Sequence, residues 1–207
     1  MKEVLGLVDE CVRIDTRLAG QLKRYHTWPT TGHQTGAEHS WNIIRIYLSV
    51  VGEEIDPHII RHAMFHDIGE HFTGDLPFPV KANNPIIKEQ IDFLEHRSMC
   101  TQLDYWNTFY QVRLTDADKK LFKQIEVLEM AEFGMDQMNL GNNHGFIIAD
   151  RCLQFVYDQA PLPRRLCIYI SKRLSLFYRQ CSSINVYDVR ELWWFAEQWE
   201  KRDDNSQ

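Results

Sequence analysis

Apolar residues recur at helical spacing along almost the whole chain. In residues 3–23, for example, one face of a helix would carry Val4, Leu7, Val8, Cys11, Ile14 and Leu18. The same spacing predicts helices over residues 3–23, 37–51, 56 to about 66–69, 86–103, about 115–139, 146–159, 162–180 and 186–201. Proline and glycine mark residues 24–32 and 74–85 as loops. The pattern therefore predicts an all-α protein.

Length and composition put these helices in one domain. The chain has 207 residues, of which 44% are hydrophobic and 25% charged, as in ordinary globular proteins. No internal repeat, low-complexity tract or clear linker divides it. We expect a single compact helical bundle over residues 1–200, followed by a polar tail at residues 201–207.

Charge and cysteine content exclude several classes of function. The formal net charge is −6 and the pI about 5.8, which argues against a nucleic-acid-binding or anionic-membrane surface. No apolar run reaches the length of about 18 residues that a membrane span needs, and acidic residues interrupt the first segment where a signal peptide would lie. The five cysteines form no Cys-x-x-Cys pair. Reduced thiols and a cytoplasmic location are therefore expected.

The residues most suggestive of chemistry gather after the helix that starts near residue 56. His66 and Asp67 are adjacent, Glu70 follows one turn later, and Asp75 lies beyond a glycine. Adjacent residues on a helix point about 100° apart, so His66 and Asp67 can approach one metal ion from neighbouring directions. The i+4 spacing from His66 puts Glu70 beside the same point.

Two further candidate ligands lie in apolar helical stripes elsewhere in the chain. His39 falls on the stripe of the helix at 37–51, which consists of Ile43, Ile46, Tyr47 and Val50. Glu126 falls between Phe122 and Met130 in the helix at about 115–139. A buried carboxylate is costly unless it is paired or bound to metal, although Glu126 at the stripe edge could instead reach water. His39 alone could be a hydrogen-bonded core histidine. Together, two imidazoles and two carboxylates suit one divalent ion such as Mn²⁺, Fe²⁺, Co²⁺, Ni²⁺ or Zn²⁺.

Two more histidines compete with this interpretation. His58, His62 and His66 recur at i+4 spacing and share one helical face, as zinc-binding histidine pairs do. The chain has no His-Glu-x-x-His motif, however. We interpret His58 and His62 as surface residues or as residues that border the site.

Several motifs in order resemble the HD-domain phosphohydrolases, above all their 5′-deoxynucleotidase branch. They are Arg24, Glu38-His39-Ser40, His66-Asp67-x-x-Glu70, Thr73-Gly74-Asp75-Leu76-Pro77-x-Pro79-Val80-Lys81, and the segment Thr115–Glu126. The resemblance covers residues 20–145. Residues 24–29 and 37–41 are also similar to small phage-type HD proteins, some of which are dATP triphosphohydrolases.

This resemblance implies a role for each metal and catalytic residue. The ion would be held by His39, His66, Asp67 and Glu126. Glu70 would act as general acid or base, or would orient water. Asp75 would orient the attacking water or protonate the leaving 5′-oxygen.

The resemblance also implies a substrate site. Arg24 would bind the phosphate, for which its planar guanidinium is suited. Lys81 would add positive charge, unless it is an exposed loop lysine. Tyr25 and Trp28 would stack on base or sugar, unless they pack against the core.

Two departures from the family pattern bear on the site. Glu126 stands where the family usually has aspartate, so its carboxylate reaches one methylene further. Tyr25 stands where the deoxynucleotidases usually have a tryptophan that helps to exclude a 2′-hydroxyl. A change of metal position and a looser preference for deoxyribose are the corresponding expectations.

The resemblance implies hydrolysis of deoxynucleoside monophosphates to nucleoside and phosphate. One alternative is a dNTP triphosphohydrolase that releases triphosphate, which would need more cations for the β- and γ-phosphates. Another is a non-catalytic nucleotide sensor, against which the intact pair of Glu70 and Asp75 argues. Homo-oligomerisation is expected from the family.

Overall fold

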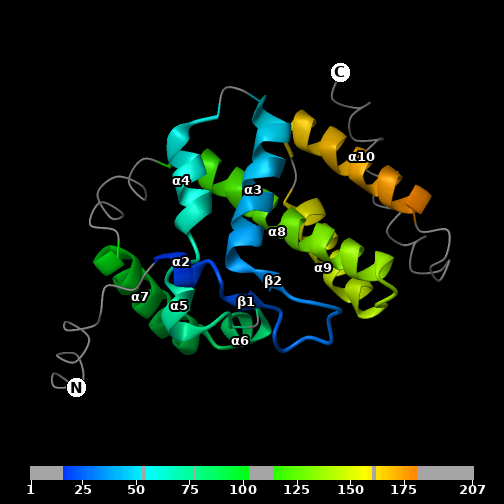
Figure 1. The fold of residues 1–207 in the computed structure, drawn as a ribbon. Helices are drawn as coiled ribbons and strands as arrows, with labels where there is room; N and C mark the ends of the chain where they lie inside the picture. Colours follow the sequence, from blue (N-terminus) through cyan, green and yellow to red (C-terminus); the bar gives the residue numbers. More distant parts are fainter. Residues whose placement is uncertain (1–15, 53–54, 77, 103–113, 160–161, 181–207) are drawn as a thin grey trace, which may run out of the picture.

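In the computed structural model, residues 16–52, 55–76, 78–102, 114–159 and 162–180 are described. Helices there are α2 (Thr16–Ala19), α3 (Gly36–Val51), α4 (Pro57–Phe65), α5 (Glu70–Thr73), α6 (Phe78–Asn83), α7 (Pro85–Gln102), α8 (Asp116–Asn139), α9 (His144–Asp158) and α10 (Arg164–Gln180). Strands β1 (Lys23–Arg24) and β2 (Gln34–Thr35) form one short antiparallel pair. The predicted all-α class is thereby confirmed (Figure 1).

Helices α3 and α8 cross at the centre of the molecule, and α4 lies beside α3 (Figure 1). Helix α10 contacts α3 near the C-terminal end of α3 (Figure 1). Helix α3 begins at a capping box, in which the Thr35 hydroxyl accepts from the Glu38 N–H and the Glu38 carboxylate accepts from the Thr35 N–H. Its buried stripe is Ile43, Ile46, Tyr47 and Val50. Because the cap fixes the start of α3, His39 lies in its first turn on the buried side.

Helices α8 and α9 form a tight antiparallel pair. Thr115 and Asp118 make a second capping box at the start of α8, and the short turn after Asn139 leads into α9. A Cβ atom added to Gly134 would lie 2.6 Å from the Gly145 carbonyl oxygen and 2.7 Å from the Ala149 nitrogen. Glycine at these crossings lets the two backbones come into contact, which fixes the position of α8 relative to α9.

Several boundaries differ from the sequence-based prediction. The helix expected to run to residue 23 ends at Ala19, and the predicted loop at 24–32 connects β1 to β2, with Lys23 opposite Thr35. The predicted loop at 74–85 contains α6, because proline is tolerated in a first helical turn, where its missing N–H needs no partner. The helix after residue 56 ends at Phe65, and α5 follows as a separate turn.

Other predictions fall partly or wholly outside the described residues. These are the segment 3–15 of the first predicted helix, the helix at 186–201 and the polar tail at 201–207, so the boundaries 1–200 of the domain stay a prediction. Within the described part of the chain, no helix combines the length and hydropathy needed to cross a bilayer.

Candidate metal and phosphohydrolase site

His39 lies completely buried in the first turn of α3. Its Nδ1 makes a short hydrogen bond with Oε2 of Glu129, from α8. Its Nε2 is also buried, and it has no hydrogen-bond partner among the described residues. The imidazole is thus held at one nitrogen and has a free lone-pair position at the other.

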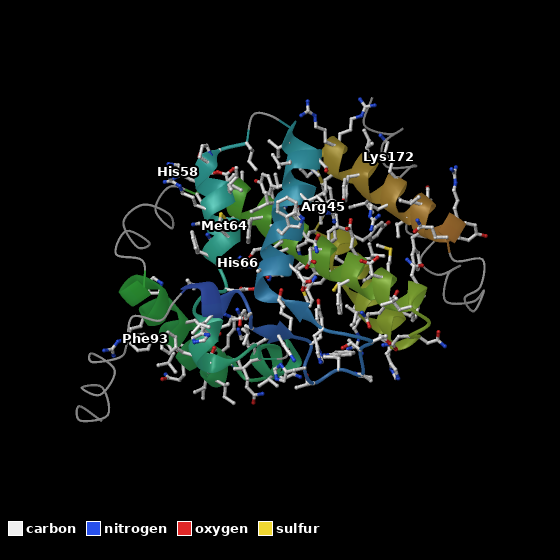
Figure 2. The ribbon with its side chains drawn as sticks, viewed as in Figure 1. Arg45, His58, Met64, His66, Phe93 and Lys172 are labelled. Atoms are coloured by element: carbon white, nitrogen blue, oxygen red, sulfur yellow. The ribbon has the colours of Figure 1, made fainter. Side chains whose placement is uncertain are left out.

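His66 lies at the end of α4 that faces α3, as Figure 2 shows. Its Nδ1 is 2.9 Å from the Ala63 carbonyl oxygen, which can only accept, so Nδ1 carries the proton of this hydrogen bond. As in His39, Nε2 is buried and lacks a hydrogen-bond partner within the described chain. The two histidines therefore present the same nitrogen to the interior.

Asp67 completes a group of three ligand atoms. Its Oδ2 is 3.2 Å from His66 Nε2 and 3.7 Å from His39 Nε2, and each residue has a ligand atom within 4.8 Å of the others. Two otherwise unpartnered imidazole nitrogens and one carboxylate oxygen converging at this spacing fit a divalent first-row metal ion. Among the residues that the structure describes, these three, from α3 and the end of α4, form a group that could hold it.

Arg24 neutralises this carboxylate in the structure. Its Nη1 lies 2.5 Å from Asp67 Oδ2 and 3.8 Å from Oε2 of Glu70, and the side chain is buried. Burial alone would lower the pKa of Arg24, but Asp67, Tyr25, Glu70 and Asp75 together outweigh it, so the pKa is raised. Burial likewise opposes ionisation of Asp67, yet His66 and Arg24 hold its pKa well below its usual range. Arg24 is therefore a fixed cation at the edge of the candidate site.

Glu70 is a second buried carboxylate beside the site. Burial and the neighbouring charge of Asp67 raise its pKa from 4.5 to about 8. Lys81, on α6, lies 3.6 Å from Oε1 of Glu70 and 3.0 Å from Oε1 of Glu95, which α7 supplies. At neutral pH the carboxyl of Glu70 can therefore hold a proton while the neighbouring carboxyl of Asp67 is ionised. A general acid must hold a proton in this way.

Lys81 is not an exposed loop lysine in this structure. Its side chain is half-buried, and Thr73 Oγ1 donates to the same Glu95 oxygen at 3.2 Å. Close contact between Gly69 and the Glu95 backbone holds α7 against this corner, since a Cβ on Gly69 would lie 2.6 Å from the Glu95 carbonyl oxygen. Contacts with Glu95 therefore hold the Lys81 ammonium group beside Glu70.

Asp75 follows Gly74, whose φ of +75° suits glycine. One oxygen of Asp75, Oδ2, accepts from the backbone N–H of Tyr25 at 3.0 Å. Tyr25 itself has a φ of +58°, which is strained for an aromatic residue. This unusual turn directs the Tyr25 N–H at Asp75 and places Arg24 next to Asp67.

The aromatic rings of the loop after Arg24 lie against the core. The Tyr25 ring stacks on Phe133 with centroids 4.2 Å apart, and the side chain is buried. Trp28 is partly buried and packs against the same hydrophobic cluster. In this structure, both Tyr25 and Trp28 pack against the core, which is the alternative that the sequence left open.

Glu126 lies near the three ligands but outside their group. Its Oε2 pairs with Lys123 Nζ at 2.9 Å. Burial alone would raise the pKa of Glu126, but Lys123 and His66 together lower it. His62, in the last turn of α4, packs edge-on against Phe122 with ring centroids 4.5 Å apart, and the charge of Glu126 acts on it. Its pKa is lowered to about 4 by burial and by His66.

Glu129 is a residue of the site that sequence reasoning missed. It is 1% exposed and binds His39, Gln34 and Asn42 through its two oxygens. The signal that could have found it is its spacing: Ile125 and Phe133 lie four residues before and after Glu129, which puts this glutamate on the apolar stripe of the helix, where a buried carboxylate needs partners.

A cavity of about 700 Å³ adjoins the carboxylates. It lies between α2, α3 and α4, and its wall includes Trp41, Ile44, Met64, Asp67 and Glu70. Trp41 and Met64 are among the most exposed large apolar side chains of the described chain. The wall is mostly apolar, with Gln21, Ser40, Asp67 and Glu70 as its polar side chains. Its volume is typical of small-molecule sites.

Comparison with known proteins identifies a family. A family model described as 5′-deoxynucleotidase YfbR-like matches residues 17–132, more than half of the chain. The chain belongs to the YfbR-like family. The matched region of this YfbR-like protein contains every site residue that the sequence predicted, and also Glu129.

Individual relatives of this YfbR-like protein are distant. A 5′-deoxynucleotidase of Yersinia pestis (strain Pestoides F) is 27% identical over 124 residues, which are 56% of this chain and 58% of the relative. A 5′-deoxynucleotidase of Yersinia pseudotuberculosis serotype O:1b (strain IP 31758) matches with the same figures. The chain therefore spans about 58% of the length of these curated relatives.

Proposed function

We propose that this protein is a metal-dependent phosphohydrolase of the HD-domain type that acts on 5′-deoxynucleoside monophosphates. The observation that carries the proposal is the convergence of His39 Nε2, His66 Nε2 and Asp67 Oδ2 beside the buried cation of Arg24. A site with a metal-binding face and a fixed cation suits a phosphate ester, and membership of a 5′-deoxynucleotidase family supports the choice of substrate.

The proposed metal ligands are His39, His66, Asp67 and Glu126. A bound divalent ion would polarise a phosphoryl oxygen and lower the pKa of water toward neutrality. Mn²⁺, Fe²⁺, Co²⁺, Ni²⁺ and Zn²⁺ are the candidates, because the donors are nitrogen and oxygen. Oε2 of Glu126 pairs with Lys123, so Glu126 would join the other three ligands through its other oxygen or after releasing Lys123.

The remaining residues would bind the phosphate and move the protons. The Arg24 guanidinium donates to phosphate oxygens, and Lys81 adds a second cation near Glu70. A water oxygen would form the new bond to phosphorus while the bond from phosphorus to the 5′-oxygen breaks; one proton of that water stays on the product phosphate and the other restores the proton that Glu70 gives up. Glu70, protonated near neutral pH, is suited to supply the proton that the 5′-oxygen needs. Asp75 would orient the water or share this acid role.

We assign the sugar and base to the cavity between α2, α3 and α4. Asp67 and Glu70 of the metal site line it, together with apolar residues that include Trp41 and Ile44. A mostly apolar cavity that adjoins the phosphate-binding groups suits a nucleotide, which has a flat apolar base and a charged phosphate. On this assignment Trp41→Ala should raise KM for the nucleotide and leave metal affinity unchanged. An unchanged KM would move the base elsewhere, with Trp28, the less buried of the two loop aromatics, as the other candidate.

The decisive experiment is a product assay with each dNMP and dNTP in the presence of Mn²⁺, Co²⁺ or Zn²⁺. Orthophosphate from monophosphates alone supports the proposal. Release of triphosphate from one dNTP would instead identify a triphosphohydrolase and its base. Nucleotide binding without any product would identify a sensor. Assembly into a homo-oligomer and a cytoplasmic location stay predictions beside this one.

A further inference from the structure

The buried carboxylate of Glu129 is bound on both oxygens. Oε2 pairs with His39 Nδ1, and Oε1 accepts from Gln34 Nε2 at 2.6 Å and from Asn42 Nδ2 at a longer 3.4 Å. These partners come from β2 and α3, whereas Glu129 belongs to α8. The carboxylate is therefore held in one orientation by three donors from two other elements, and it cannot rotate away from His39 without losing them.

This orientation decides which nitrogen of His39 is available. A neutral imidazole has one N–H donor and one lone-pair acceptor. A carboxylate beside Nδ1 accepts a hydrogen bond from an N–H there, so the proton stays on Nδ1 and the lone pair is on Nε2. That Nε2 is the buried nitrogen without a hydrogen-bond partner in the described chain, and it lies 3.7 Å from Asp67 Oδ2.

We propose that Glu129 is a positioning residue of the metal site, which fixes the tautomer and ring orientation of His39 so that Nε2 faces the ion. Carboxylates that accept from the distal nitrogen of a ligating histidine also make that histidine a more basic ligand. The inference rests on the proposed metal site, but not on the identity of the nucleotide. The Ala63 carbonyl oxygen holds Nδ1 of His66 in the same way. Of the two candidate ligand histidines, His39 is therefore the one whose Nδ1 is held by a charged group.

The competing explanation is that Glu129 only fastens α3 to α8. Glu132, three residues further along α8, provides the matched control because it is also buried and also fastens these helices. Its partners are Arg45 at 2.5 Å, the Tyr169 hydroxyl at 2.6 Å and Arg173 at 3.0 Å. None of these residues is among the proposed metal ligands. Glu129→Gln and Glu132→Gln therefore remove the same charge from the same helix, but only the first touches His39.

Metal binding to the full chain, titrated with Mn²⁺ or Co²⁺ by calorimetry, separates the two explanations. We expect Glu129→Gln to weaken binding about 10- to 100-fold, with Glu129→Asp in between and Glu132→Gln unchanged. Equal affinity of Glu129→Gln and the parent protein, or an equal loss in both glutamine variants, would overturn the inference. Failure of the parent to bind metal would overturn the metal site itself, whatever the outcome of the product assay.

A second measurement needs no variant. Long-range ¹H–¹⁵N NMR of the metal-free parent protein reads the tautomer of each histidine directly. The inference requires His39 to carry its proton on Nδ1, and a proton on Nε2 alone would refute it even if Glu129→Gln did not fold. Where Glu129→Gln does fold, the His39 signals should show a mixture of tautomers, while those of His66 should not change.

Discussion

Arg24 and Asp67 are 43 positions apart in the sequence, yet Nη1 of Arg24 lies 2.5 Å from Oδ2 of Asp67. The short pairing of β1 with β2 and the strained turn at Tyr25 hold Arg24 there. The same carboxylate oxygen faces both candidate ligand histidines. One group therefore connects the proposed phosphate-binding residue to the proposed metal ligands.

Arg24→Ala should separate phosphate binding from metal binding. Loss of a fixed donor to the phosphate should lower kcat/KM by about 10²- to 10³-fold. Metal affinity should stay the same or increase, because a cation that competes for Asp67 is removed. Steady-state kinetics and calorimetric metal titration measure the two effects. Lys23→Ala removes the exposed neighbouring cation and should change neither, so a loss of metal binding in Arg24→Ala alone would contradict this assignment.

Asp67→Ala should abolish metal binding and activity while the helices persist. The variant removes the only carboxylate in the group of three ligand atoms found in the described chain. Far-UV circular dichroism reports the helices, and calorimetry reports the metal. Asp116→Ala is the control, since its side chain is fully exposed at the start of α8. Normal turnover by Asp67→Ala after removal of metal would eliminate the site.

Glu126 tests whether a fourth ligand comes from α8. Glu126→Ala should weaken metal binding and Glu126→Asp should retain activity, with a changed order of preference among the metals. Lys123→Met removes the present partner of Glu126 and should not weaken metal binding. If Glu126→Ala binds the ion as tightly as the parent, the fourth ligand is another group or water.

Glu70 predicts a particular pH dependence of stability in the metal-free protein. Its folded pKa of about 8 lies above the value of 4.5 for a free glutamate, so the folded state keeps a proton that the unfolded state releases between these pH values. The free energy of unfolding should therefore fall as pH rises through this window. Glu70→Gln cannot ionise, so its stability should fall less between pH 4.5 and 8 in denaturant titrations. Parallel curves for the two proteins would refute the raised pKa.

The same variant bears on catalysis. Glu70→Gln should reduce kcat by about 10²- to 10⁴-fold, the usual contribution of a general acid or base. Metal affinity should be retained, because Glu70 is not among the proposed ligands. Unchanged kcat would exclude Glu70 as the acid and leave Asp75 in that role.

Gly134→Ala tests the crossing of α8 and α9. The new Cβ would lie 2.6 Å and 2.7 Å from backbone atoms of α9, which cannot rotate away as a side chain could. We expect a loss of about 1–3 kcal/mol in the free energy of unfolding, typical of overpacking. Gly141→Ala is the comparison, since open space surrounds its Cβ and only its φ of +81° is unfavourable. Equal stability of Gly134→Ala and the parent would mean that the helices can move apart freely.

Local signals in the sequence were sufficient for the starts of α3, α4 and α8. Thr35 and Glu38, and Thr115 and Asp118, stand three residues apart and cap α3 and α8, while Asp56 and Pro57 start α4. The apolar stripe of α3 was also correct, since Ile43, Ile46, Tyr47 and Val50 are its buried apolar residues. Capping and periodicity depend on neighbours within one or two turns, and such neighbours can be read from the sequence.

The sequence could also name the candidate ligands, because His66 and Asp67 are adjacent and His39 lies in an apolar stripe. It could not show that Glu129, 90 positions from His39, holds the other nitrogen of that ring. Nor could it show that the Tyr25 ring packs on Phe133, or that Lys81 turns inward to Glu70 and Glu95. These choices depend on how α3, α6, α7 and α8 pack together. The partner of a side chain is set by the helices and strands that surround it. The spacing of residues along one helix does not indicate which helices or strands those are.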